Sequence, residues 1–210
     1  MEDARRFMVE KYTEKIGEIE LYKIFPGMDD IQGLTIDTRD NSIWFCSFGE
    51  NKVRHITKDG EILGEFHLDQ ANGIAYDHKN DSLWILTPGK LLNTDKNGGV
   101  LKKFTFSYEG QDQIFLDEKN NIIYFTAGNN YQEPNDVYAI DLSTGHIKKK
   151  YTLKDSYAVE GIFIDDHDMY ILNDGYYHNA KVPVNCVNHY RINNQIKFWY
   201  LIDKISFLKS

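Results

Sequence analysis

The chain has 210 residues, of which 41% are hydrophobic and 27% charged, a composition that suits one good-sized globular domain or two small ones. The formal net charge of −8 argues against a nucleic-acid or anionic-membrane partner and is compatible with a cationic ligand. No apolar run is long enough to span a membrane, which argues against membrane insertion, and the N-terminus lacks the apolar core of a signal peptide. Aromatic residues make up 14% of the chain, which favours an all-β fold.

The first predicted element is a short helix within residues 1–17. Its apolar residues follow helical spacing and are Ala4, Phe7, Met8, Tyr12 and Ile16. An amphipathic helix here would dock on the rest of the domain, or would pair with copies of itself or with a partner chain. Residues 18–25, EIELYKIF, predict a strand that follows the helix.

Four later segments share one pattern, in which a polar residue precedes an apolar strand that ends in aspartate. Glycine follows the polar residue in three of them. The segments are QGLTIDTRDNSIWF (32–45), NGIAYDHKNDSLWI (72–85), DQIFLDEKNNIIYF (112–125) and EGIFIDDHDMYI (160–171). Such regular recurrence is typical of a repeat architecture.

The rest of each unit also aligns. A second strand carries Trp44, Trp84, Tyr124 or Tyr170. Glycine turns then precede a further strand in three units, at 58–60 (KDG), 96–98 (KNG) and 143–145 (STG). Four antiparallel strands in each unit of about 40 residues are typical of a propeller blade. The sequence therefore predicts an all-β β-propeller of four or five four-stranded blades. We place the propeller in residues 18–195, with repeats near 18–60, 61–98, 99–145 and 146–195. A surplus strand or C-terminal tail, 196–210, would dock on the propeller or on a partner.

The first strand of each blade is expected to line the central channel. Gln32, Asn72, Asp112 and Glu160 share one repeat position, so the symmetry should bring them together at one mouth of that channel. The glycine that follows three of them would allow close approach of backbones. The aspartate that closes each strand, as at Asp37, should hydrogen-bond the following turn.

These units resemble those of the NHL, SdiA-regulated and gluconolactonase (senescence-marker) propellers. The resemblance implies that Gln32, Asn72, Asp112 and Glu160 would hold Ca²⁺ or another divalent cation in the channel, as in a metal-dependent lactonase or esterase. Three features favour binding over catalysis: Gln32 is a poor metal ligand, Gln113 replaces the glycine, and only four repeats can be counted.

Two segments between predicted strands, 128–136 and 173–190, are rich in aromatic and amide side chains, which suit sugar recognition by stacking and hydrogen bonding. The candidate ligand-binding residues are Asn129, Asn130, Tyr131, Tyr176, Tyr177, His178 and Asn179. The plain alternative is that long loops are simply polar. The sequence thus favours a non-catalytic, carbohydrate-binding propeller that resembles phage tail receptor-binding proteins, in a cytoplasmic or virion location. The metal-dependent lactonase is the alternative.

Other residues suggest no catalytic centre. The two cysteines, Cys46 and Cys186, are in no metal-binding or redox motif and are expected to be reduced, buried thiols. The histidines match no metalloprotease spacing, and no serine nucleophile motif is present. The lysine runs 102–103 and 148–150 lie on predicted outer strands, where lysine discourages edge-to-edge pairing.

Overall fold

A computed structural model of the chain describes 28–107, 112–127, 135–154, 156, 159–165, 167–173 and 186–192. Within these residues the regular elements are all strands, and they form four antiparallel sheets. The predicted helix within 1–17, the predicted strand 18–25 and the tail 196–210 lie outside the described residues.

The first two sheets have four strands each, paired in chain order. Blade 1 contains β1 (Ile31–Asp37), β2 (Ser42–Ser47), β3 (Lys52–Ile56) and β4 (Ile62–His67). Blade 2 contains β5 (Ile74–Asp77), β6 (Ser82–Thr87), β7 (Lys90–Thr94) and β8 (Val100–Thr105).

The last two sheets continue the same order. Blade 3 contains β9 (Ile114–Asp117), β10 (Ile122–Ala127), β11 (Asn135–Asp141) and β12 (Ile147–Leu153). Blade 4 contains β13 (Val159–Asp165), β14 (Asp168–Asn173) and β15 (Cys186–Arg191) among the described residues.

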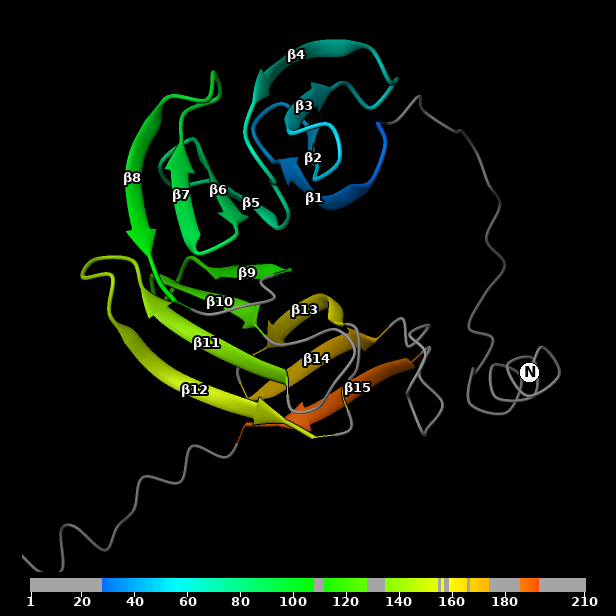
Figure 1. The fold of residues 1–210 in the computed structure, drawn as a ribbon. Helices are drawn as coiled ribbons and strands as arrows, with labels where there is room; N and C mark the ends of the chain where they lie inside the picture. The colour runs from blue at the N-terminus through cyan, green and yellow to red at the C-terminus, as the bar shows by residue number, and fades with distance from the viewer. Residues whose placement is uncertain are drawn as a thin grey trace, which may run out of the picture.

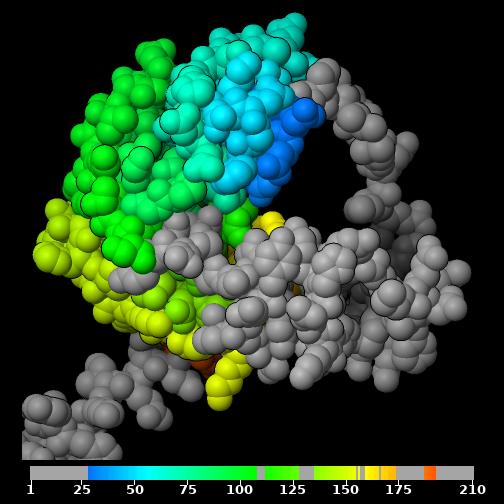
Figure 2. Space-filling view, in the orientation of Figure 1, coloured from blue at the N-terminus to red at the C-terminus, as the bar shows by residue number. Residues whose placement is uncertain are grey.

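The blades follow one another around an axis, as Figure 1 shows. Their first strands contact each other in succession, β1 with β5, β5 with β9 and β9 with β13. Figure 2 shows the blades packed together in chain order, from blue through cyan and green to yellow-green. The chain is therefore a β-propeller with four described blades, and the predicted fold class is confirmed.

The turns have the backbone conformations that their residues favour. Gly60, Gly98 and Gly145 have φ values of 88°, 87° and 75°, in the left-handed region that suits glycine. Closing aspartates also act as predicted: Asp37 accepts a hydrogen bond from the backbone N–H of Arg39 at 3.0 Å. In blades 2 and 3, Asp77 and Asp117 accept from the backbone N–H three residues later, those of Asn80 and Asn120.

The hydrophobic core lies between blades rather than in one central mass. Trp44 of blade 1 packs with Ile74 and Leu83 of blade 2, and Trp84 packs with Ile114 and Phe125 of blade 3. The ring of Trp84 also stacks on Phe104, with ring centroids 5.9 Å apart. Both tryptophans thus fill the space between neighbouring blades, and Trp84 also contacts an outer strand of its own blade.

Neighbouring inner strands approach so closely that a side chain would not fit between them. A Cβ atom added to Gly33 would lie 2.5 Å from the carbonyl oxygen of Asn72. One added to Gly73 would lie 2.8 Å from the carbonyl oxygen of Asp112. The two glycines thus permit the same backbone contact at consecutive blade interfaces, as the repeat pattern predicted.

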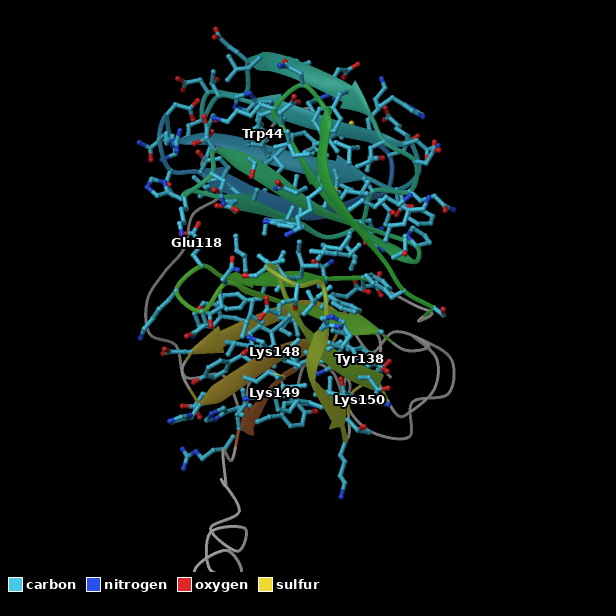
Figure 3. All side chains as sticks on the ribbon, turned by 90° about the vertical axis from the view of Figure 1, so that its left-hand side faces the viewer. Trp44, Glu118, Tyr138, Lys148, Lys149 and Lys150 are labelled. Atoms are coloured by element: carbon cyan, nitrogen blue, oxygen red, sulfur yellow. The ribbon has the colours of Figure 1, made fainter. Side chains whose placement is uncertain are left out.

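The lysine runs lie on the outer strands β8 and β12, as predicted. Figure 3 shows Lys148, Lys149 and Lys150 beside Tyr138 on the side of the molecule that faces the viewer. Lys148 pairs with Asp141, and the ammonium of Lys150 lies 2.8 Å from Asp136. These contacts fit the protection of an outer strand better than a basic binding patch.

Trp84→Ala should lower the free energy of unfolding by about 3–5 kcal/mol, because it empties a large volume between blades 2 and 3. Urea denaturation measures the change, and Val100→Ala on the exposed face of β8 is the control. A small loss of stability together with a large loss of ligand binding would instead assign Trp84 to a binding site.

Gly73→Ala should destabilise the protein by more than about 1 kcal/mol, because the new methyl group would collide with backbone atoms of blade 3. Gly64→Ala is the matched control, since a Cβ there would meet no atom within 4 Å. We expect Gly64→Ala to be neutral or slightly stabilising in the same denaturation experiment. Equal effects of the two changes would contradict the close approach at Gly73.

Candidate functional site

The predicted channel residues lie where the four inner strands begin, which we call the axial end. Asn72 lies two residues before β5 and Asp112 two residues before β9, and both side chains are buried. Gln32 and Glu160 are the second residues of β1 and β13 and are half-buried. All four therefore occupy one end of the described blades.

Asn72 and Asp112 are brought together across the interface of blades 2 and 3. The amide nitrogen Nδ2 of Asn72 donates to the carboxylate oxygen Oδ1 of Asp112 at 2.9 Å. Backbone bonds to β6 hold the Asn72 end of the pair, because the N–H of Asn72 donates to the carbonyl of Leu86 at 2.9 Å. The pair follows from the close backbone approach at Gly73, which brings equivalent positions of blades 2 and 3 next to each other.

Gln32 has a different partner. Its amide donates to Asp30 at 2.5 Å, within the segment that leads into β1. Its backbone carbonyl accepts a bond of 3.5 Å from the side chain of Gln113, which comes from blade 3. The residue that replaces the repeat glycine in blade 3 thus reaches a blade that is not its neighbour, which shows how narrow the axis is.

The inner strands of blades 1 and 4 are irregular at this end. The pairing of β1 with β2 shifts register between Ile31 and Leu34, and that of β13 with β14 shifts between Val159 and Gly161. Such bulges redirect side chains and occur often near functional sites. They place Gln32 and Glu160 on bulged backbone, in contrast to Asn72 and Asp112.

The two long loops predicted to bind ligand also start at the axial end. The connections from second to third strands are 48–51, 88–89, 128–134 and 174–185. In the antiparallel sheets these connections lie at the end where the inner strand begins: Val159 pairs with Asn173, which pairs with Cys186. The predicted ligand-binding residues, Asn129, Asn130, Tyr131, Tyr176, Tyr177, His178 and Asn179, lie outside the described residues.

The axial end carries further acidic residues, and the carboxylate of Glu50 is engaged with the backbone. The N–H of Asp29 donates to Glu50 at 2.9 Å, and Asp29 in turn accepts from the hydroxyl of Ser47 through its carbonyl. In the part of the chain that the structure describes, no three His, Cys, Asp or Glu side chains gather in a way that could hold a metal ion. The coordination of a cation by Gln32, Asn72, Asp112 and Glu160 stays a prediction.

The opposite end of blades 1 and 2 holds an ionic network that sequence reasoning missed. The ammonium of Lys96 lies 2.5 Å from both Asp37 and Asp81, and the hydroxyl of Tyr76 donates to Asp81 at 2.7 Å. Arg39 pairs with Asp81 at 3.0 Å. Asp37 is fully buried, so Lys96 compensates a carboxylate that water does not reach.

The charges of this network stabilise one another. Burial alone would lower the pKa of Lys96, but its hydrogen bonds to Asp37 and Asp81 outweigh burial and raise that pKa. Hydrogen bonds from Lys96 and Tyr76 lower the pKa of Asp81. Burial, then hydrogen bonds to Asp81 and Asp37, raises the pKa of Tyr76. All three groups therefore keep their ordinary charge states at neutral pH. This fits a structural role, in which Lys96, Asp37, Asp81 and Tyr76 hold blades 1 and 2 together, better than acid–base chemistry. We call these four residues the latch.

A signal for this network was present in the repeat. Tyr76 stands where the other inner strands carry Ile36, Leu116 and Ile164, so one blade has a polar aromatic residue at an aliphatic position. Departures from a repeat mark positions with a separate role.

Cys46 is a buried free thiol, as predicted. Its sulfur lies 2.6 Å from the carbonyl oxygen of Asn72, and burial raises the pKa of the thiol to about 12. A thiol that stays protonated is a poor nucleophile, so Cys46 acts as a packing residue.

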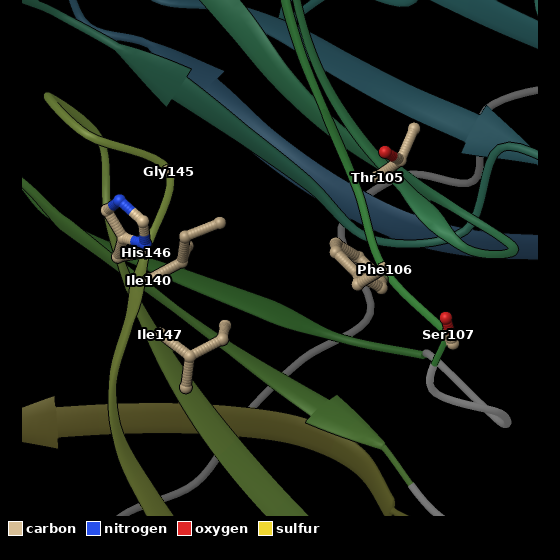
Figure 4. A pocket seen from close by; sticks show the side chains of 7 residues that line it. All are labelled: Thr105, Phe106, Ser107, Ile140, Gly145, His146 and Ile147. Atoms are coloured by element: carbon tan, nitrogen blue, oxygen red, sulfur yellow. The ribbon is translucent and has the colours of Figure 1, made fainter.

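A separate cavity of about 360 Å³ lies between blades 2 and 3 (Figure 4). Phe106, Ile140 and Ile147 supply its apolar lining, and its polar groups come from Thr105, Ser107 and His146. It lies beside the turn from β11 to β12, and it contains none of the predicted site residues.

Comparison with known proteins shows that the fold of this chain is similar to that of a solved structure, but it does not identify a family. No family model matches the chain, and no curated protein matches its sequence. Among solved structures, the chain is similar to Kuenenia stuttgartiensis hydrazine synthase, with a TM-score of 0.59 and 10% sequence identity. The match covers 76% of this chain and 50% of that chain, so this chain spans about half the length of its structural neighbour. At this identity the likeness concerns the fold alone.

No helix among the described residues is long and apolar enough to cross a membrane.

Lys96→Met should cost about 3 kcal/mol of unfolding free energy, because it leaves the carboxylate of Asp37 buried without its cation. Adding Asp37→Asn should recover part of the loss, since the uncompensated charge is then removed. Lys58→Met is the matched control: Lys58 has the same place in the turn of blade 1 and only an exposed bond to Asn41. A loss no larger than that of the control would refute the latch.

Proposed function

We propose that the protein is a non-catalytic, ligand-binding β-propeller that recognises a carbohydrate at its axial end. The observation that carries the proposal is topological. The connections 128–134 and 174–185 leave blades 3 and 4 at the same end as the channel residues, whereas blades 1 and 2 have the short connections 48–51 and 88–89. The long connections contain the tyrosine, asparagine and histidine residues that suit sugar recognition.

The polar channel residues would form the floor of this site at the axial end. Asn72 and Asp112 form a buried amide–carboxylate pair whose position is held by the backbone of neighbouring blades. Binding sites are commonly built in this way, because scaffold strands fix the geometry and the loops between them supply the varied contacts. A cell-surface glycan, of the kind bound by phage tail receptor-binding propellers, is the ligand class that we favour.

A metal-dependent lactonase of the gluconolactonase type is the second candidate. It is favoured by the meeting of an amide and a carboxylate at the repeat position that the resemblance assigns to metal ligands. Calcium prefers such oxygen donors, and when bound it would supply a Lewis acid for carbonyl substrates. Here Asp112 and Glu160 would provide the negative charge, and Asn72 and Gln32 neutral oxygens.

Two sets of variants separate these functions. A printed array of bacterial and mammalian glycans is probed with the wild-type protein, and the best glycan is then titrated by calorimetry. Replacing Tyr176 and Tyr177 by alanine should weaken binding by about tenfold or more, as for aromatic contacts at a binding centre. Asp112→Asn with Glu160→Gln keeps the shape of the channel and should leave glycan binding nearly unchanged.

Calcium chloride alone is the probe for the alternative. If the lactonase assignment is right, saturating calcium should raise the melting temperature of the wild type, because a ligand that binds only the native state stabilises it. The Asp112→Asn, Glu160→Gln protein should lose that stabilisation together with lactone hydrolysis. Stoichiometric calcium binding by the wild type, without any glycan bound on the array, would overturn our proposal in favour of the enzyme.

A further inference from the structure

The outer strands of the first three blades differ in how their free edges are protected. β4, β8 and β12 are the last strands of their sheets, and no described strand pairs with their outer side. In each of them, the pairing with the third strand skips one residue near the start, which is Leu63, Leu101 or Lys148. Because this bulge recurs, the three strands can be compared position by position.

The two positions after the bulge carry lysine in two of the three strands. They are Lys102 and Lys103 in β8, and Lys149 and Lys150 in β12. Lysine on an edge discourages pairing with another strand, because like charges would face each other. In β4 the same positions hold Gly64 and Glu65, and the strand contains no lysine. β4 is therefore the one of these three outer strands without lysine protection.

β4 also exposes apolar side chains beside its free edge. Ile62 is 62% exposed and Leu63 is 53% exposed. The equivalent pair in β8, Val100 and Leu101, is exposed as well, but lysines follow it. A Cβ atom added to Gly64 would meet no atom within 4 Å, so the space beside β4 is open. Figure 1 shows β4 on the outer side of blade 1, where another strand could add to the sheet.

The free edge of β4 presents the backbone groups of two residues. The N–H of Leu68 donates to the carbonyl of Asn51 beside β3 at 2.9 Å, so Leu68 faces β3. Alternate residues of an antiparallel strand point their backbone groups to opposite edges. Phe66 therefore also faces β3, and Glu65 and His67 face outward. An added strand would form its hydrogen bonds with these two residues.

A second copy of β4 suits this edge. Two antiparallel copies related by a two-fold axis at Phe66 place Glu65 of each chain opposite His67 of the other. An axis at Glu65 or at His67 would instead bring two identical side chains together. An imidazole can donate to a carboxylate, whereas two carboxylates repel each other, so charge favours the axis at Phe66. The carboxylate of Glu65 is fixed on its strand by Lys52 and Arg54.

We propose that β4 pairs with β4 of a second copy of this chain, so that the two copies of blade 1 form one continuous sheet across a two-fold axis. Ile62 and Leu63 of each copy would lie beside the end of β4 in the other. The contact uses the same surface of both chains, so it closes at a dimer. It is also small, and we expect the dimer to form at high protein concentration.

Light scattering of the full chain over about a thousandfold range of protein concentration measures this dimer, because small interfaces are weak. Leu63→Lys with Gly64→Lys gives β4 the lysines that β12 carries at the same positions. The double change should raise the dissociation constant of the dimer by about tenfold or more, since like charges would meet at the axis. Leu101→Lys is the matched control: it changes the same bulge position of β8, where Leu101 is 61% exposed, and should leave the dimer unchanged.

Amide exchange measured by NMR on the wild type distinguishes strand pairing from a side-chain contact. In concentrated protein, the N–H groups of Glu65 and His67 should exchange at least about tenfold more slowly than in dilute protein, because they become hydrogen-bonded across the axis. The N–H groups of Phe66 and Leu68 should change little, since they face β3 in both states.

The outcomes are distinct. A monomer over the whole concentration range, a dimer that Leu63→Lys with Gly64→Lys leaves intact, or an equal effect of Leu101→Lys would overturn the proposal. Slower exchange at other amides but not at Glu65 and His67 would assign dimerisation to another surface and also overturn it. Circular dichroism verifies that the lysine variants are folded, and the exchange measurement on the wild type stands without them. None of these results depends on glycan or calcium binding.

Discussion

The contact on which the rest of the structure depends is the backbone approach of successive inner strands. Gly33 lies against the carbonyl of Asn72, and Gly73 lies against that of Asp112. This spacing lets Trp44 and Trp84 fill the wider outer part of each interface, and it brings Asn72 within a hydrogen bond of Asp112. Because the same contact creates both the core and the polar pair, the candidate site is a direct product of the packing rather than an addition to it.

Two residues that depart from the repeat pattern make polar contacts that their equivalents in the other blades are not placed to make. Blade 3 replaces the glycine by Gln113, and this side chain spans the axis to blade 1. Tyr76 departs from the aliphatic pattern and joins Lys96, Asp37 and Asp81 in a latch between blades 1 and 2. The two departures act at opposite ends of the inner strands. Gln113 crosses the axis, and the ionic network holds the interface of blades 1 and 2 with charged side chains.

Local signals made the blades predictable from sequence. Alternating strands, Asx-Gly turns and closing aspartates each depend on neighbouring residues, so turns such as those at Gly60 and Gly98 could be identified in advance. The Asn72–Asp112 pair followed from repeat symmetry. The partner of Gln32 did not, because a bulge at the start of β1 turns this residue toward Asp30. The latch at Lys96 also depends on side chains from two blades, which a pattern within one repeat does not specify.

The fold alone says little about function, because a propeller can serve many activities and a likeness at 10% identity concerns architecture alone. The unequal lengths of the connections at the axial end bear on function more directly. Blades 1 and 2 close this end with the short connections 48–51 and 88–89, and the first is tied to Asp30 through Phe48. Such short, tethered loops have little freedom to contact a ligand. In the site that we propose, specific contacts would therefore come from blades 3 and 4, whose connections are long, and Asn72 and Asp112 would form the polar floor beneath them.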